Sequence, residues 1–157
     1  MIEGYCVGGG VATAIACDMR IATKDTKYGI PAAKLGLAYG FDNLRQLVEL
    51  VGPSNAKRIL FTGDMIDGDD AHRIGLVDEL CALDELEDKV LSIADKISAN
   101  APLTVLASKE TVKHVLRPEI RDHQKLKEMA KICFDSDDYR EGREAFMEKR
   151  KPEFKGR

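Results

Sequence analysis

The chain has 157 residues, of which 44% are hydrophobic and 32% charged, and its formal net charge is −3. This balance indicates one soluble globular domain of ordinary size and excludes a general nucleic-acid binder. No apolar stretch reaches the roughly 18 residues of a membrane span, and no signal-peptide pattern begins the chain. Four scattered cysteines without a C-x-x-C pair indicate reduced, mostly buried thiols of a cytoplasmic protein: Cys6, Cys17, Cys81 and Cys133.

The first part of the chain, to about residue 82, has the pattern of a mixed α/β region. Three glycines, Gly8 to Gly10, precede an almost wholly apolar segment over 11–17, which predicts a short helix buried all round. The pattern also predicts strands over 19–22, 27–30 and 76–80, helices over 41–51, 54–61 and 69–74, and a loop or broken helix over 32–40. Gly52 and Pro53 are expected to separate the two longer helices.

From Leu83 onward the hydrophobic pattern is purely helical. Apolar residues recur every three or four positions, and prolines begin new segments. The pattern predicts helices over 83–97, 103–116, 119–134 and 138–149, with Asp138 and Glu141 as a capping box. We therefore expect two regions, 1–82 and 83–157, and the second ends in a strongly basic tail that begins at Lys149.

The glycine run is the strongest chemical signal in the chain. Glycine permits close approach of a ligand, and the first N–H groups of a helix have no partner within the helix. They also lie at the positive end of the helix dipole, so the run predicts a site for an anion or a developing oxyanion. The alternative is a tight strand-to-helix turn without a ligand. A phosphate loop is disfavoured, because no Gly-Lys-Ser/Thr follows the run.

Short segments along the whole chain, in their order and spacing, resemble the crotonase (enoyl-CoA hydratase/isomerase) superfamily. They are Gly4-Tyr5-Cys6-Val7-Gly8-Gly9-Gly10, Ala16-Cys17-Asp18-Met19-Arg20-Ile21-Ala22, Leu35-Gly36-Leu37, Phe61-Thr62-Gly63, Ala71 with Gly75-Leu76-Val77, Lys109-Glu110, and residues 138–155. The resemblance is to the C-terminal portion of such a protein.

The resemblance implies an α/β fold in which 1–82 is the C-terminal part of a β-β-α spiral core. Residues 83–157 would then form a helical region for trimerisation and coenzyme A contact. It implies an acyl-CoA thioester as ligand, coenzyme A as part of the substrate and no separate cofactor. It also implies a homotrimer or hexamer, with neither nucleic acid nor membrane as partner.

The same resemblance assigns roles to the glycine run. The family stabilises a thioester enolate oxygen with two backbone N–H groups, and one of them would belong to Gly9. Gly8, Gly10, Ala12 and Ala32 would line the acyl pocket. The other donor lies in the family's N-terminal half, which this chain lacks.

The chain departs from the family's hydratases at two positions. Where those enzymes carry a general acid and base glutamate, this chain has Ala12 and Ala32. Alanine cannot transfer a proton, a function that typically contributes about 10²–10⁴-fold per group. Two-glutamate hydration is therefore disfavoured, and isomerisation, decarboxylation or slow hydration remain open.

Tyr39 and Asp42 are candidates for the missing chemistry. Tyr39 resembles a tyrosine that orients the acyl carboxylate in the methylmalonyl-CoA decarboxylase branch, and its alternative is a packing residue on the loop. Asp42 is a candidate base, and its alternative is a cap of the helix that begins near Phe41.

At the basic end, the resemblance places Lys149 near the coenzyme A phosphates and Phe146 near the adenine; the alternative is a solvated basic tail. The three histidines, His72, His114 and His123, have no partner at ligand spacing. We expect them to be surface or interface residues, and we expect no metal site.

Two functions from different classes remain. The first is a crotonase-like enzyme, a lyase or isomerase that stabilises a thioester enolate, with a decarboxylase-like reaction as one form of it. The second is a non-catalytic acyl-CoA-binding or oligomerisation module. The sequence leaves open the acyl group, the reaction type and the residue that transfers the proton.

Overall fold

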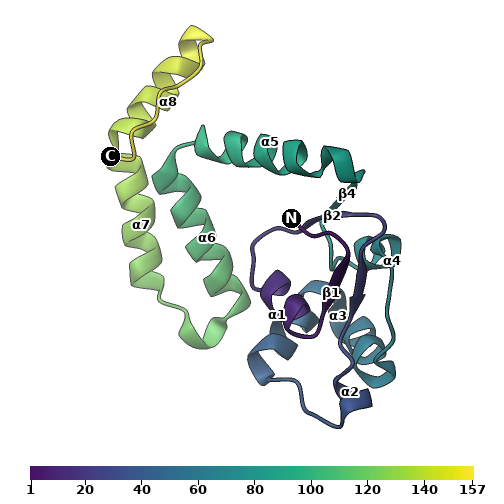
Figure 1. The fold of residues 1–157 in the computed structure, drawn as a ribbon. Coiled ribbons are helices and arrows are strands. Elements are labelled where there is room, and N and C mark those ends of the chain that lie inside the picture. Colours follow the sequence, from purple (N-terminus) through teal and green to yellow (C-terminus); the bar gives the residue numbers. More distant parts are fainter. The chain divides into compact units, whose positions relative to one another are not determined.

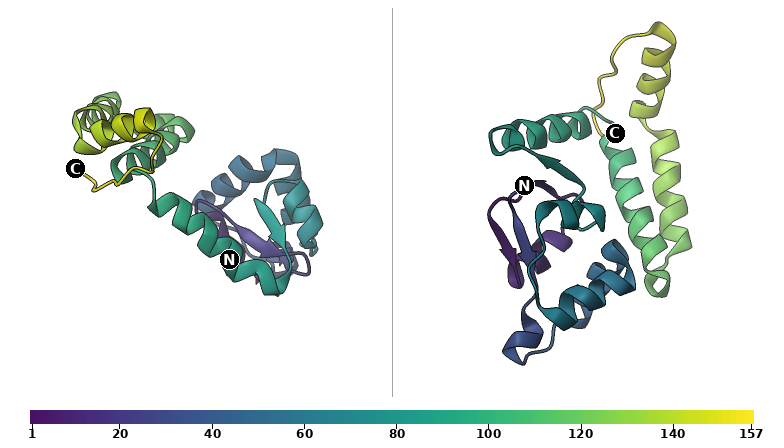
Figure 2. Two further views of the ribbon diagram at one scale, coloured as in Figure 1. Left: turned by 90° about the horizontal axis from the view of Figure 1, so that it is seen from above. Right: turned by 90° about the vertical axis from the view of Figure 1, so that its right-hand side faces the viewer.

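A computed structural model describes all 157 residues, and the chain divides into two compact units, residues 1–91 and 92–157. Figure 1 labels the elements of both units and Figure 2 gives two further views. The division falls inside α5 (Leu86–Ser98). The structure is mixed α/β and mostly helical.

The first unit alternates very short strands with helices. Its elements before α5 are β1 (Tyr5–Val7), α1 (Gly9–Ile15), β2 (Ile21–Thr23), β3 (Lys27–Gly29), α2 (Ala32–Leu35), α3 (Phe41–Thr62), α4 (Gly68–Arg73), β4 (Glu79–Cys81) and the 3₁₀ helix η1 (Leu83–Glu85).

The four strands form two separate parallel pairs. Strand β1 pairs with β3, with Tyr5 opposite Lys27, and β2 pairs with β4, with Ile21 opposite Glu79. Parallel strands need a crossover connection. Between β1 and β3 that connection contains α1, so the turn between β1 and α1 is anchored beside the sheet.

Helix α3 supplies much of the core of this unit. Its buried side chains Leu47, Val51 and Ile59 belong to the same apolar cluster as Val11 and Ile15 of α1. The helix is interrupted at Gly52, whose φ of 74° is not helical, directly before Pro53. The expected pair of helices over 41–51 and 54–61 is thus confirmed, with the break where glycine and proline predict it.

Two expectations for the first unit are wrong in detail, and one open alternative is decided. Helix α1 buries only Val11 and Ile15, and its other face is open. Of the two alternatives for 32–40, the structure has the broken helix, with one turn at 32–35 and no helix from 36 to 40. The expected strand over 76–80 lies at 79–81, because the N–H groups of Leu76 and Val77 both donate to the carbonyl of Ala71 at the end of α4.

The second unit is helical. Helices α6 (Pro102–Leu116) and α7 (His123–Asp135) lie side by side, and α8 (Asp137–Glu148) follows α7 (Figures 1 and 2). The 3₁₀ helix η2 (Pro118–Ile120) connects α6 and α7, and residues 151–157 have no regular secondary structure. No helix in either unit combines the length and apolarity needed to cross a membrane.

Side-chain caps fix the starts of α7 and α8, and they correct two predictions. Helix α7 begins at His123 rather than 119, because the carboxylate of Asp122 accepts the N–H of Lys125 at 2.9 Å. Helix α8 is capped by Ser136, whose hydroxyl accepts the N–H of Tyr139 at 3.0 Å. Asp138 therefore does not cap this helix, and its carboxylate has other partners.

A buried arginine connects β2 to the segment between α4 and β4. Arg20 is 3% exposed, and its guanidinium donates to the carbonyls of Leu76 (2.9 Å) and Cys17 (2.8 Å) and pairs with Asp78 (2.9 Å). The backbone N–H of Arg20 also donates to Asp78, at 2.6 Å. One buried side chain thus binds two backbone carbonyls and one carboxylate.

We expect Arg20→Leu to lower the free energy of unfolding by about 3 kcal/mol, because it removes the guanidinium from two carbonyls and from its ion pair with Asp78. Urea denaturation followed by circular dichroism measures the change. Arg73→Leu is the control, since Arg73 forms an exposed ion pair with Asp70, worth about 0–1 kcal/mol. Equal losses in the two variants would contradict the special role of Arg20.

Candidate functional site

The glycine turn between β1 and α1 is set by the backbone of Gly8. Its φ of 54° and ψ of −107° lie where a side chain would be strained. Its N–H donates to the carbonyl of Gly29 in β3 at 2.8 Å. Its carbonyl accepts the N–H of Ala12 at 3.1 Å, which is the first helical bond of α1. Gly8 therefore joins both strands of one sheet to the helix.

The next residues present the start of α1 to an open side of the unit. Gly9 and Gly10 are exposed, and their N–H groups precede the first helical bond. A Cβ built at Gly9 would meet no atom within 4 Å, and Gly9 does not have a positive φ. No contact within this chain requires glycine at position 9. The absence of a side chain there leaves the N–H groups at the start of α1 open to a ligand.

Tyr39 reaches the glycine turn from the loop after α2. Its hydroxyl donates to the carbonyl of Gly8 at 3.1 Å, and its side chain packs against the core. Burial raises the pKa of Tyr39, so this proton stays on the hydroxyl near neutral pH. The structure thus brings Tyr39 to the turn, where its hydroxyl holds the Gly8 carbonyl.

Positions 12 and 32 carry alanine, whose side chain cannot transfer a proton. Ala12 is half-buried on α1, and Ala32 is buried at the start of α2. Burial raises the pKa of the Cys6 thiol and raises the pKa of Tyr28 to about 12. Both groups are protonated near neutral pH, so neither provides a base beside the turn.

Asp42 makes its ion pair with Arg45 and has no described contact with the glycine turn or with Tyr39. Its carboxylate is 86% exposed and is 3.7 Å from the guanidinium of Arg45 on the next turn of α3. The helix cap is Gly40, with extended backbone and no side-chain bond, so the interpretation of Asp42 as the cap is wrong. Asp42 instead lies in the first turn, where a negative charge favours the helix dipole.

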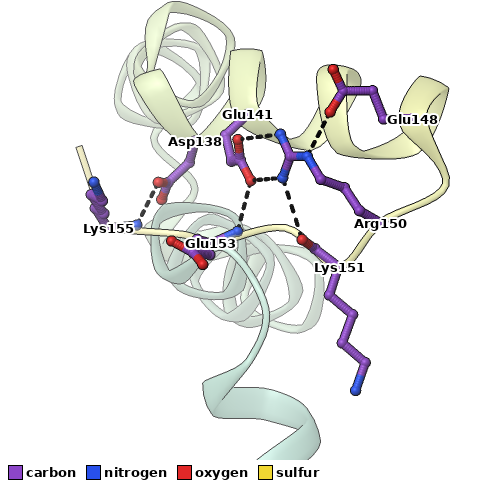
Figure 3. Close-up of polar contacts among 7 residues, drawn as sticks. All are labelled: Asp138, Glu141, Glu148, Arg150, Lys151, Glu153 and Lys155. Atoms are coloured by element: carbon purple, nitrogen blue, oxygen red, sulfur yellow. Dashed lines mark hydrogen bonds and ion pairs between the residues drawn. The ribbon is translucent and has the colours of Figure 1, made fainter.

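In the second unit, Phe146 and Lys149 end α8. The ring of Phe146 is 83% exposed, and Lys149 is the only residue other than glycine with a positive φ, 56°. Figure 3 shows the tail that follows. Arg150 there pairs with Glu141 and Glu148, at 2.6 and 2.7 Å. The tail is therefore less basic in effect than its sequence indicates.

The Arg150 guanidinium also changes the acid behaviour of its partner. Its hydrogen bonds, with the N–H of Glu153, lower the pKa of Glu141 to about 2. Glu141 is thus ionised over the whole range in which proteins are normally studied. Neither this carboxylate nor Asp138 was singled out by the sequence as more than a capping pair, because the residues they bind lie 9 to 18 positions away.

The histidines and cysteines correct two further expectations. His114 is buried at 5% exposure, and its ring accepts the N–H of Asp122 at 3.4 Å, so it is not a surface residue. Of the four cysteines, only Cys6 is buried, and all four are free thiols. No group of three or more histidine, cysteine, aspartate or glutamate side chains is arranged to hold a metal ion.

The whole chain, residues 1–157, matches the family described as Enoyl-CoA hydratase/isomerase. It is 38% identical to the crotonyl-CoA hydratase of Syntrophomonas wolfei over 98% of this chain and 59% of that protein. It is 37% identical to the short-chain-enoyl-CoA hydratase of Clostridium acetobutylicum over 99% of this chain and 60% of that protein.

Solved structures give the same result for the fold. An enoyl-CoA hydratase/isomerase family protein from Hyphomonas neptunium has a TM-score of 0.93 and 34% sequence identity, covering 99% of this chain and 60% of that one. The chain thus spans about 60% of the length of the relatives it matches. The narrower prediction, that the match is to the C-terminal portion of the family, is not borne out. The role of the helices in trimerisation is not confirmed either. With its full length matched in sequence and its fold matched in structure, the chain belongs to the enoyl-CoA hydratase/isomerase (crotonase) family.

Proposed function

We propose that this chain handles acyl-CoA thioesters and stabilises a thioester enolate oxygen with the N–H of Gly9. The observation that carries the proposal is the open glycine turn in a chain of this family. An N–H group at the first turn of a helix has a fixed direction and a favourable dipole, so it stabilises a developing negative charge without reorganisation. Gly8, Gly10, Ala12 and Ala32 would line the acyl end of the site.

This chain supplies one of the two donors that the family uses. The resemblance assigns the second to residues that have no counterpart here. Removal of one oxyanion donor typically costs about 10²–10³ in rate. We therefore expect the isolated chain to bind a thioester more readily than it turns one over.

The reaction we propose is not two-glutamate hydration. The relatives named above are hydratases, but here Ala12 and Ala32 offer no acid or base. Enolate stabilisation without a paired glutamate fits isomerisation or a decarboxylase-like reaction. In both reactions Tyr39 would act beside the turn, because its hydroxyl already contacts the carbonyl of Gly8. Asp42 remains a candidate base only for an open, solvent-facing site.

The partner is a second copy of the chain, in a homotrimer or hexamer. The support is the number of large apolar side chains left exposed on the helices of the second unit. They include Leu106, Val112, Val115, Leu116, Ile132 and Phe134. A surface of this kind favours burial against another protein surface.

Replacement of Gly9 tests the donor directly. Gly9→Pro removes the N–H, whereas Gly9→Ala keeps it, and proline is well tolerated at the first helical position. Acetoacetyl-CoA is a suitable probe because its enolate absorbs in the near ultraviolet. We expect the proline variant to bind the enolate about 10–100-fold more weakly than the alanine variant, the effect of one hydrogen bond to a charged group.

Equal enolate binding by Gly9→Pro and Gly9→Ala would overturn the assignment of this donor. Circular dichroism of both variants checks that α1 and its surroundings still fold. Loss of binding in both variants to the same extent would point instead to a steric requirement for glycine.

We expect Tyr39→Phe to lower the free energy of unfolding by about 1 kcal/mol, because the Gly8 carbonyl keeps the N–H of Ala12 as a partner. Enolate binding should fall less than in Gly9→Pro, since Tyr39 acts through the turn. Urea denaturation and the same absorbance assay measure both effects. A larger loss of enolate binding than in Gly9→Pro would instead make Tyr39 a direct ligand contact.

A panel of enoyl-, dienoyl- and malonyl-type CoA esters separates the enzyme from a non-catalytic binder. Turnover of any ester supports the enzyme, whereas binding of esters without turnover supports the binding module. Thermal shifts with coenzyme A test binding alone. Lys149→Gln should reduce the shift and Lys151→Gln, its control on the same tail, should not. If coenzyme A does not shift the melting temperature of the unmodified chain, coenzyme A binding by this chain is contradicted.

A further inference from the structure

The tail of the second unit returns along α8 although it has no secondary structure of its own. Two carboxylates on α8, Asp138 and Glu141, receive it (Figure 3). They are three residues apart and so lie on one face of the helix. Every contact described below lies within residues 92–157.

Glu141 holds the first part of the tail. Its two oxygens accept both terminal nitrogens of Arg150, at 2.6 and 2.9 Å, in a paired geometry. One of these oxygens also accepts the backbone N–H of Glu153 at 2.8 Å. One side chain therefore fixes both a guanidinium and the backbone three residues later.

Asp138 holds the last part of the tail. It is 3% exposed, and its oxygens accept the N–H groups of Lys155 at 2.6 Å and Gly156 at 2.8 Å. Its own N–H donates to the carbonyl of Arg157 at 3.2 Å. Between the tail residues Glu153 and Lys155, the ring of Phe154 lies against Gly142, where an added Cβ would be 3.4 Å from the ring. The tail is thus fastened at both ends and packed in the middle.

The chain turns from α8 into the tail through the left-handed backbone of Lys149. A left-handed conformation is unfavourable for a residue with a side chain and persists only where its surroundings impose it. Here it reverses the chain so that Arg150 reaches Glu141, and the N–H of Arg150 donates to the carbonyl of Ala145 at 3.0 Å. Lys149 is thus held on one side by the last turn of α8, where its N–H also donates to the carbonyls of Ala145 and Phe146, and on the other side by the tail that follows it.

We propose that Glu141 and Asp138 are positioning residues for coenzyme A binding. They fasten residues 150–156 to α8 and so hold Lys149 in a fixed orientation at the end of the helix. In that orientation Lys149 receives the phosphates of coenzyme A, and Phe146 receives its adenine. The inference rests on the proposed function, because it assumes that this end of α8 contacts coenzyme A. Neither carboxylate contacts the ligand. They act through the backbone on either side of Lys149.

The fastening itself is tested by hydrogen–deuterium exchange of the full 157-residue chain. Glu141→Gln and Arg150→Gln open the same pair from its two sides. We expect the amides of Glu153, Lys155 and Gly156 to exchange at least about tenfold faster in both variants. Glu144→Gln, an exposed carboxylate of the same helix, is the control and should leave these amides protected. Unchanged exchange in both test variants would overturn the fastening.

The positioning role is tested by comparing two ligands, coenzyme A and pantetheine, which lacks the adenine and phosphates. We expect the ratio of their affinities, from calorimetry, to fall about tenfold in Glu141→Gln and Arg150→Gln, as in Lys149→Gln, while pantetheine binding stays constant. A purely structural role would not move this ratio. Circular dichroism confirms that α8 remains folded.

The two proposals fail in different ways. If the unmodified chain binds coenzyme A no better than pantetheine, the proposed contact with the phosphates is wrong and the positioning role falls with it, whatever the exchange shows. If the unmodified chain prefers coenzyme A and the variants keep that preference despite a released tail, only the positioning role is overturned.

Discussion

The backbone of Gly8 is the constraint on which the first unit depends. Its N–H binds β3, and its carbonyl binds both α1 and the hydroxyl of Tyr39. These three bonds fix the direction in which α1 leaves the sheet, and hence the direction of the N–H of Gly9. Because the positive φ of Gly8 excludes a side chain without strain, one residue type determines the geometry of the whole turn.

In the second unit, hydrogen bonds also fix a segment of backbone, here the C-terminal tail. Its tail has no sheet or helix to join, so side-chain carboxylates of α8 replace the missing backbone partners. A carboxylate that accepts backbone N–H groups and a guanidinium is well satisfied even where it is buried. In both units, therefore, the candidate ligand-binding residues Gly9 and Lys149 are held in place by hydrogen bonds of other residues.

Family membership and chemistry point in partly different directions. The match over the whole chain makes this a crotonase-family protein, while the chain has alanine at positions 12 and 32, where the resemblance places the two glutamates of the family's hydratases. In the proposed function, the glycine turn would stabilise the enolate, and the side chains beside it would decide how the enolate reacts. Under the proposed function, a chain with this turn and without the two glutamates would bind the enolate and leave proton transfer to other groups.

The sequence by itself determined most of the elements, the family and the glycine turn, because helical periodicity, proline and glycine act over a few neighbouring residues. It did not determine that Tyr39 binds Gly8, that His114 is buried, or that Asp138 and Glu141 hold the tail. Those contacts join residues that are far apart in the chain or that lie beside it only after folding. Local pattern carries no information about which distant partner a polar side chain will meet, so only the tertiary structure decided them.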